Sequence, residues 1–249
     1  MSAIEDYEKE RTERIDRFGS DNKFKENSSQ WLEESMRKKY VYNFSFLGRP
    51  IIQYPQDMIA MQEIIWQVKP NLIIETGIAH GGSLMLSASM LEINASCGGT
   101  KEGFVLGIDV DIRDHNRMEI ESHPMSKRIK MIQGSSISSE IIERVRKHAE
   151  GKEKILVILD SNHTHEHVLA ELEAYARLVT VGSYCVVFDT FVEDLPSDVF
   201  PDRPWGPGDN PKTAAWEYLS SHPEFEIDNS IQQKLLLTTA PDGYLKRIK

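Results

Sequence analysis

From about residue 57 onward, segments with helical spacing of apolar residues alternate with short, nearly continuous apolar runs. The apolar runs that predict strands cover residues 71–75, 103–109, 129–133, 154–160, 184–189, 224–227 and 234–239, with a turn signal at 240–243 before a short last segment, 244–248. Helical spacing covers residues 58–68, 83–93, 138–148, 165–178 and 212–221. Strands that alternate with helices of this length predict βαβ units and a mostly parallel sheet.

The predicted fold is a doubly wound α/β domain. Residues 154–160, KILVILD, are almost entirely apolar up to their acidic end, as a strand buried on both faces should be. We expect a Rossmann-like, mostly parallel sheet of seven strands with helices on both faces over residues 45–249. Residues 1–44 are rich in charge and predict an N-terminal helical arm, which either contacts another copy, covers a site or frays.

The first parallel strand ends in a glycine-rich turn, ETGIAHGGS, placed where ligands bind in such sheets. Its spacing differs from the dinucleotide motif G-x-G-x-x-G, because an alanine stands at the second glycine position. An acid just before the turn suits a cationic amine or sulfonium better than a pyrophosphate, which favours S-adenosylmethionine over NAD. A turn that only closes a βα unit is the alternative. The candidates for cofactor contact in this turn are Glu75, Gly77, Ala79, Gly81, Gly82 and Ser83.

Two further strand ends predict contacts with the same cofactor. Asp109 ends the second strand in GIDVD, where an acid can accept both ribose hydroxyls of a nucleoside. The separation between Gly77 and Asp109 is longer than the ~20 residues of the dinucleotide motif. The polar insert 94–103 explains the additional residues. Ser135 and Ser136 follow the third strand and are candidates for the same ligand.

Two later strands end in aspartate, ILD at Asp160 and VFD at Asp189. Carboxylates at adjacent strand ends provide the oxygen ligands that Mg²⁺ prefers, and Thr190 could add a hydroxyl. Either aspartate alone could instead be a helix cap or turn former.

Three histidines follow the first of these aspartates in SNHTHEHV. His163 stands three residues beyond Asp160 and suits a general base, since an unperturbed histidine titrates near neutral pH. His163 and His167 could also share a helix face as ligands of a soft metal, or the histidines could simply be solvated. His80, in the glycine turn, could touch an acceptor or face solvent.

Composition narrows the function classes. The 249 residues include 29 Lys+Arg and 39 Asp+Glu, a net charge of −10, which argues against a general nucleic-acid binder. Two cysteines give no disulfide framework, and no apolar stretch is long enough to span a bilayer. With no signal-peptide pattern at the N-terminus, we expect a cytoplasmic protein.

Several segments, taken in order, resemble the cephalosporin hydroxylase-type family: PIIQYPQDMIAMQEII, ETGIAHGGS, GIDVDIR, ILDSNHTHEHVLAELEAYARLVTVGSYCVVFDT and APDGYLKRI. The resemblance covers roughly residues 45–249. Despite its name, that family is similar to class I S-adenosylmethionine-dependent O-methyltransferases, including Mg²⁺-using macrolide and rhamnosyl sugar O-methyltransferases. In those relatives an aspartate after the fourth strand and an acidic pair after the fifth hold the metal, and a histidine acts as base.

Carried over to this chain, the resemblance places the first aspartate on Asp160, the base on His163 and the second acid of the pair on Asp189. The first acid of the pair falls on Phe188, so one carboxylate is missing. Thr190 falls where a catechol-type arrangement has asparagine. The resemblance therefore implies Mg²⁺ as a second cofactor, on a ligand set with one departure.

The sequence thus predicts a homo-oligomeric O-methyltransferase that acts on a hydroxyl of a sugar or small natural product. Residues 53–57 and the Pro/Gly-rich loop 200–211 with Trp205 could wall the acceptor pocket, although that loop could also be a stiff connector. Two alternatives stay open. One is an oxygen-dependent hydroxylase with a two-His, one-carboxylate iron site, and the other is a non-catalytic binding or assembly protein that has lost its metal.

Overall fold

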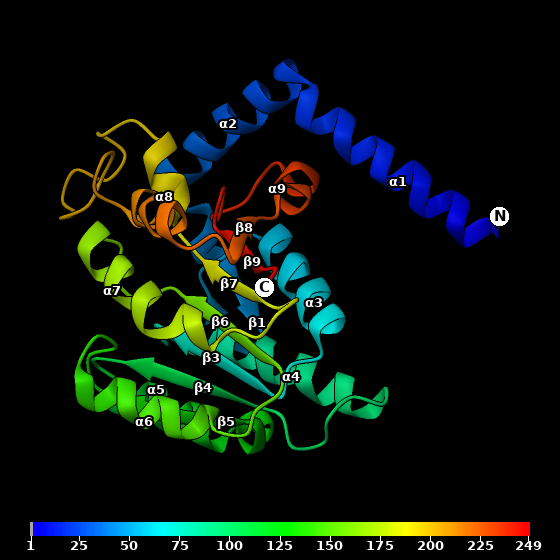
Figure 1. Ribbon diagram of the computed structural model, residues 1–249. Coiled ribbons are helices and arrows are strands. Elements are labelled where there is room, and N and C mark those ends of the chain that lie inside the picture. Colours follow the sequence, from blue (N-terminus) through cyan, green and yellow to red (C-terminus); the bar gives the residue numbers. More distant parts are fainter. Residues whose placement is uncertain (1) are drawn as a thin grey trace.

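The computed structural model describes residues 2–249 and shows one α/β domain with a long N-terminal arm (Figure 1). The strands are β1 (Phe44–Phe46), β2 (Arg49–Ile51), β3 (Leu72–Thr76), β4 (Phe104–Asp109), β5 (Ile129–Gln133), β6 (Ile155–Leu159), β7 (Tyr184–Val187), β8 (Phe225–Ile227) and β9 (Tyr244–Arg247). The α-helices are α1 (Ala3–Ser20), α2 (Asn22–Arg37), α3 (Pro55–Val68), α4 (Gly82–Ser96), α5 (Asp114–Ser122), α6 (Ser139–Ala149), α7 (His165–Tyr175), α8 (Pro211–Ser221) and α9 (Asn229–Leu235). Short 3₁₀ segments include η1 (Tyr40–Asn43) and η4 (Thr190–Asp194).

The central sheet has seven strands in the order β5-β4-β3-β6-β7-β9-β8. β3 pairs in parallel with both β4 and β6, so the strand order reverses beside β3. β9 runs antiparallel between β7 and β8. The predicted doubly wound, mostly parallel seven-stranded sheet is confirmed, and its switch point lies at the carboxyl ends of β3 and β6.

Alternate residues of each strand enter two separate apolar layers, as the period of two requires. Ile73 belongs to the layer that includes residues of α3, α4, α5 and α9. Leu72 and Ile74 belong to the layer formed with α6, α7 and α8. Both layers are closed to water, which makes the sheet a rigid platform for the loops at its carboxyl edge.

One predicted strand is wrong. Residues 234–239 do not form a strand, because the chain completes α9 at Leu235 and then runs irregularly. The seventh strand is β9, within the segment 244–248, for which the pattern predicts only a short ending. The Thr239 N–H, a donor that strand pairing could have used, binds the Asp57 carboxylate at 2.9 Å instead, and the same carboxylate accepts the hydroxyls of Thr238 and Thr239.

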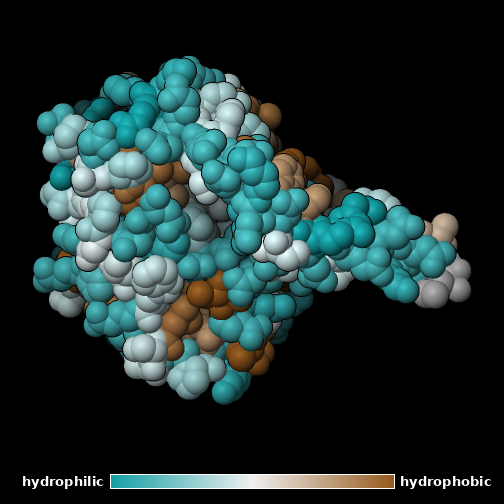
Figure 2. All heavy atoms as spheres, turned by 90° about the horizontal axis from the view of Figure 1, so that it is seen from above, coloured by the Kyte–Doolittle hydropathy of each residue, from teal (hydrophilic) through white to brown (hydrophobic). Residues whose placement is uncertain are grey.

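The N-terminal arm consists of α1 and α2, joined at Asp21, which caps α2 by accepting the Phe24 N–H at 2.9 Å. α1 buries none of its residues and extends from the body as a largely hydrophilic rod (Figure 2). α2 is attached to the body by a bidentate ion pair between Arg37 and Asp198, at 3.0 and 3.1 Å. The helical arm agrees with the sequence, whereas its role in self-association stays a prediction.

Candidate functional site

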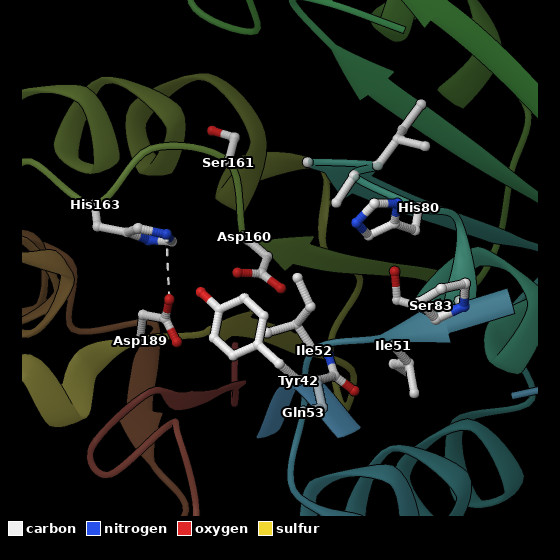
Figure 3. A pocket seen from close by; sticks show the side chains of 15 residues that line it. Tyr42, Ile51, Ile52, Gln53, His80, Ser83, Asp160, Ser161, His163 and Asp189 are labelled. Atoms are coloured by element: carbon white, nitrogen blue, oxygen red, sulfur yellow. Dashed lines mark ion pairs between the residues drawn. The ribbon is translucent and has the colours of Figure 1, made fainter. Parts of the chain in front are cut away.

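A pocket lies at the switch point of the sheet and gathers most of the sequence candidates (Figure 3). The glycine turn after β3 forms one wall, and the loops after β6 and β7 supply four polar side chains. The candidates that line it are Gly77, Ala79, His80, Gly82, Ser83, Asp160, His163 and Asp189. Segments far apart in the sequence therefore meet where the fold predicts a ligand.

The glycine turn is held in place by contacts that only a small residue permits. At Gly77, with φ +89°, a Cβ would lie 1.9 Å from the Asp160 carbonyl oxygen. At Gly82 it would lie 2.2 Å from the Pro50 carbonyl oxygen. Ala79 takes φ 44°, and its carbonyl accepts the Asn116 side-chain N–H at 2.9 Å. The turn is thus close-packed against Asp160, which directly follows β6, and against Pro50 of β2.

Glu75 lies beneath this turn and is 1% exposed. It accepts a hydrogen bond from the Ser83 hydroxyl, whereas its second oxygen, Oε2, has no partner among residues 2–249. Burial raises the pKa of Glu75 to about 7, and the hydrogen bond from Ser83 opposes that shift. Because Ser83 lines the pocket and Glu75 does not, Glu75 reaches the pocket through Ser83.

A second pocket opens on the other side of the Asp160 loop. It is lined by Ile108, Asp109, Val110, Ser135, Ser136, Ser161, Asn162 and His167, and Ser161 lines both pockets. Asp109 binds the glycine turn: its Oδ2 accepts the Ile78 N–H at 2.8 Å and the Ala79 N–H at 3.3 Å. The three nucleoside candidates, Asp109, Ser135 and Ser136, therefore share a pocket that adjoins the turn.

Asp160, His163 and Asp189 form a cluster that could hold a metal ion, with one ligand atom of each within 4.8 Å of the others. His163 Nε2 lies 3.2 Å from Asp189 Oδ2. Burial, and then the charge of Asp189, raise the pKa of Asp160 well above its usual range. Burial also raises the pKa of Asp189, which His163 and Arg203 oppose. A cation bound between these two carboxyls would stabilise the ionised form of both.

The backbone after β7 aims Asp189 into the pocket. Asp189 adopts φ 58°, ψ 20°, a left-handed conformation that aspartate tolerates better than most residues. Phe188, one residue earlier, is 1% exposed in an apolar layer. Thr190 is fully buried, and its hydroxyl donates to the Pro241 carbonyl at 2.6 Å. Thr190 is not among the residues that line the pocket, so its role as a metal ligand stays a prediction.

The three histidines after Asp160 have different partners. His163 faces Asp189, and its ring meets Trp205 edge to face at 5.3 Å. His165 lies 2.8 Å from the Thr213 hydroxyl and 3.0 Å from Glu217, away from both pockets. His167 lines the second pocket. Within the described chain, His163 and His167 therefore do not share a site, which removes the soft-metal alternative.

Two segments that are distant in sequence from the metal candidates lie near them in the fold. Trp205, in the loop 200–211, contacts the His163 ring but does not line the first pocket, so the acceptor wall expected from this loop stays a prediction. Tyr42, which no sequence pattern predicts, lines the first pocket, and its hydroxyl points toward Asp160 and Asp189 (Figure 3). No local signal marks Tyr42, since it follows the arm and reaches the pocket only through the fold.

Comparison with known proteins places the chain in a family. A profile of the rhamnosyl O-methyltransferase/CmcI family matches residues 38–248. The rhamnosyl O-methyltransferase of Mycobacterium leprae (strain TN) is 30% identical over 224 residues, covering 87% of this chain and 90% of that protein. The enzyme of the same name from Mycobacterium bovis (strain BCG / Pasteur 1173P2) is 32% identical over 229 residues, covering 88% and 86%.

Solved structures of the family share the fold. A structure of CmcI with Mg and S-adenosylmethionine aligns with a TM-score of 0.56 at 19% identity, covering 84% of this chain and 78% of that one. An apo structure of CmcI aligns with a TM-score of 0.55 at 20% identity, covering 84% and 77%. At this identity the likeness concerns the fold.

The family resemblance and the enzyme class predicted from the sequence motifs are thereby confirmed, and the acceptor is left open. On its profile match and its curated relatives, the chain belongs to the rhamnosyl O-methyltransferase/CmcI family of O-methyltransferases.

Proposed function

We propose that the protein transfers the methyl group of S-adenosylmethionine to a hydroxyl of a saccharide or related natural product, with the help of a divalent metal. The observation that supports this most is the cluster of Asp160, His163 and Asp189 in the pocket that the glycine turn also lines. Methyl donor and acceptor oxygen must be held in line. A site that combines a donor turn with a metal cluster meets that requirement.

The two adjoining pockets fit the methyl donor. The second pocket offers Asp109 for the ribose hydroxyls and Ser135 and Ser136 for the base. The first pocket has the buried acid Glu75 beneath its wall, with one carboxylate oxygen unpartnered within residues 2–249. When ionised, this carboxylate would favour the ammonium and sulfonium groups of the donor, and their positive charge would in turn favour its ionised form. S-adenosylmethionine supplies an electrophilic methyl group. When the methyl group is transferred, both electrons of the S–C bond stay on sulfur, and the acceptor oxygen provides the electron pair of the new O–C bond.

The three-residue cluster fits a hard divalent cation. Asp160 and Asp189 provide carboxylate oxygens, and His163 provides a ring nitrogen as a third ligand atom or as a base. Mg²⁺ in such a set would lower the pKa of a hydroxyl that it binds. Phe188 removes the further carboxylate of the family pattern, so we propose that water or acceptor oxygens complete the coordination.

His163 is the proposed general base. Its Nε2 faces Asp189 at 3.2 Å, so in this arrangement the nitrogen carries a proton and acts as the partner of the carboxylate. With a cation on Asp189, the neutral tautomer that carries its proton on Nδ1 would leave a lone pair on Nε2, which could take the acceptor proton. Trp205, edge to face with the imidazole, limits its rotation. His163 would then remove the proton while Asp160 and Asp189 fix the oxygen.

The relatives suggest the acceptor class. Those at 30 and 32% identity are rhamnosyl O-methyltransferases, and this chain covers most of their length. Tyr42 lines the first pocket with an aromatic ring of the kind that packs against a sugar ring. We therefore propose a saccharide before other natural products.

The competing functions have less support. A facial-triad hydroxylase needs two histidines and one carboxylate, whereas the cluster found within residues 2–249 has one histidine and two carboxylates. A non-catalytic binding protein would have no reason to keep that cluster in the donor pocket.

Calorimetry tests the proposal directly. S-adenosylhomocysteine, the product form of the donor, should bind the full chain, and NAD should not. Mg²⁺ affinity should fall at least about tenfold in Asp160→Ala and in Asp189→Ala, with His165→Gln as a control outside both pockets. NAD binding without S-adenosylhomocysteine binding would overturn the cofactor assignment. Unchanged Mg²⁺ affinity in both alanine variants would overturn the metal assignment alone.

A further inference from the structure

The second pocket contains a chain of polar contacts that the proposed reaction does not explain. The Ser136 hydroxyl lies 3.1 Å from His167 Nε2. The same nitrogen lies 3.4 Å from the Ser161 hydroxyl and 3.5 Å from Glu171 Oε1. Glu171 is fully buried, and its Oε2 has no partner within residues 2–249. A buried acid that orients a histidine at the wall of a pocket points to recognition of a ligand there.

The contacts decide which atom of His167 carries the proton. Ser161 donates its hydroxyl proton to Glu171 Oε1 at 2.6 Å, so it faces His167 with lone pairs. The Glu171 carboxylate also faces Nε2 with lone pairs. An unprotonated Nε2 would face the lone pairs of both groups and have only the Ser136 hydroxyl as a donor, so the contacts favour the form that carries the proton on Nε2.

It follows that Ser136 is an acceptor toward His167 and a donor toward the pocket. Its oxygen accepts the Nε2–H of His167, and the described part of the chain offers its own proton no other hydrogen-bond acceptor. Its backbone is fixed as well, because the Tyr175 hydroxyl donates to the Ser136 carbonyl. Ser136 is buried and lines the pocket with Asp109.

We propose that the Glu171–His167 pair sets Ser136 as a hydrogen-bond donor to N1 of the donor's adenine, and so makes the pocket selective for adenine over hypoxanthine. This rests on the proposed function in that S-adenosylmethionine is taken as the ligand. Ser136 touches the base, whereas His167 and Glu171 are positioning residues.

The chemistry of the two bases makes the inference testable. Adenine presents N1 as an acceptor. Hypoxanthine carries a proton on N1 and would set this donor against the Ser136 hydroxyl proton. Leaving two buried donors facing one another costs about tenfold or more in affinity.

The experiment is calorimetry on the full chain with S-adenosyl-L-homocysteine and S-inosyl-L-homocysteine. The wild type should bind the adenine compound at least about tenfold more tightly. Ser136→Ala and His167→Phe should each reduce that ratio to about twofold or less, and the double variant should add nothing further. His167→Gln, whose amide can donate from a similar position, should retain more of the ratio than His167→Phe.

His165→Gln is the matched control, since it lies two residues away on the same helix and outside both pockets, and it should keep the wild-type ratio. Ser136→Ala guards against misfolding of the His167 variants, because it removes a single hydroxyl. A Ser136→Ala protein that keeps the wild-type ratio overturns the inference, as does a wild type that binds both compounds equally. A wild type that binds neither compound removes the proposed function and this inference with it.

Discussion

Replacing Gly77 by alanine should destabilise the folded protein in two separate ways, both set by the place of Gly77 in the donor turn. The first is backbone strain, since φ is +89°, and an L-residue in the left-handed region loses about 1–2 kcal/mol. The second is overlap. The new Cβ would lie 1.9 Å from the Asp160 carbonyl oxygen, whereas C···O contacts lie at ~3.3–3.6 Å. Forcing the backbone apart adds about 1–3 kcal/mol.

Gly182→Ala is the matched control, because Gly182 has φ +83° and no atom within 4 Å of the place where a Cβ would lie. Urea unfolding should show a loss of about 1–2 kcal/mol for Gly182→Ala and about 2–5 kcal/mol for Gly77→Ala. Because the atom displaced belongs to Asp160, Gly77→Ala should also weaken Mg²⁺ binding, and Gly182→Ala should not. Equal losses of stability with unchanged Mg²⁺ affinity would refute the coupling of the turn to the metal cluster.

Three titratable side chains, Glu75, Asp160 and His163, lead to further predictions. The pKa of Glu75 is raised to about 7, so between about pH 4.5 and 7 the folded state holds a proton that the unfolded chain has lost. The contribution of Glu75 to stability is therefore greatest below about pH 4.5 and is lost as pH rises through 7, by at most about 3 kcal/mol. Urea unfolding at pH 5 and pH 8 should show a smaller pH dependence in Glu75→Gln than in the wild type, and an undiminished dependence contradicts the prediction. Asp160→Asn should raise the melting temperature of the metal-free protein by relieving the carboxyl pair while weakening Mg²⁺ binding, so a lower melting temperature would count against that repulsion. His163→Gln should lower kcat about 10²–10⁴-fold with S-adenosylhomocysteine affinity unchanged; a loss of affinity instead of rate would make His163 a binding residue.

Local patterns are enough to predict the sheet and most of the pocket. Strands β3, β4, β6 and β7 are buried on both faces, so their apolar runs are continuous, and each of them ends at or just before a candidate residue. The topology rule for parallel sheets then brings Asp160 and Asp189 to one edge. That is why the metal cluster can be expected from the sequence.

What the sequence could not predict depends on contacts between distant segments. Residues 234–239 look like a strand, but their polar groups bind Asp57, which lies about 180 residues earlier and sends no local signal. Tyr42 enters the pocket from the end of the arm for the same kind of reason. The pairing of His167 with Glu171 has no sequence signal either, because burial of Glu171 is a property of the packed helix and not of its residue order.

The central claim is that the methyl donor and a divalent metal occupy one pocket, formed by the glycine turn and by Asp160, His163 and Asp189. Nuclear magnetic resonance with S-adenosylmethionine labelled with ¹³C at the methyl group, and Mn²⁺ in place of Mg²⁺, measures this directly. We predict strong paramagnetic broadening of the bound methyl signal, lost in Asp160→Asn/Asp189→Asn. A bound methyl signal that Mn²⁺ leaves sharp would contradict the account.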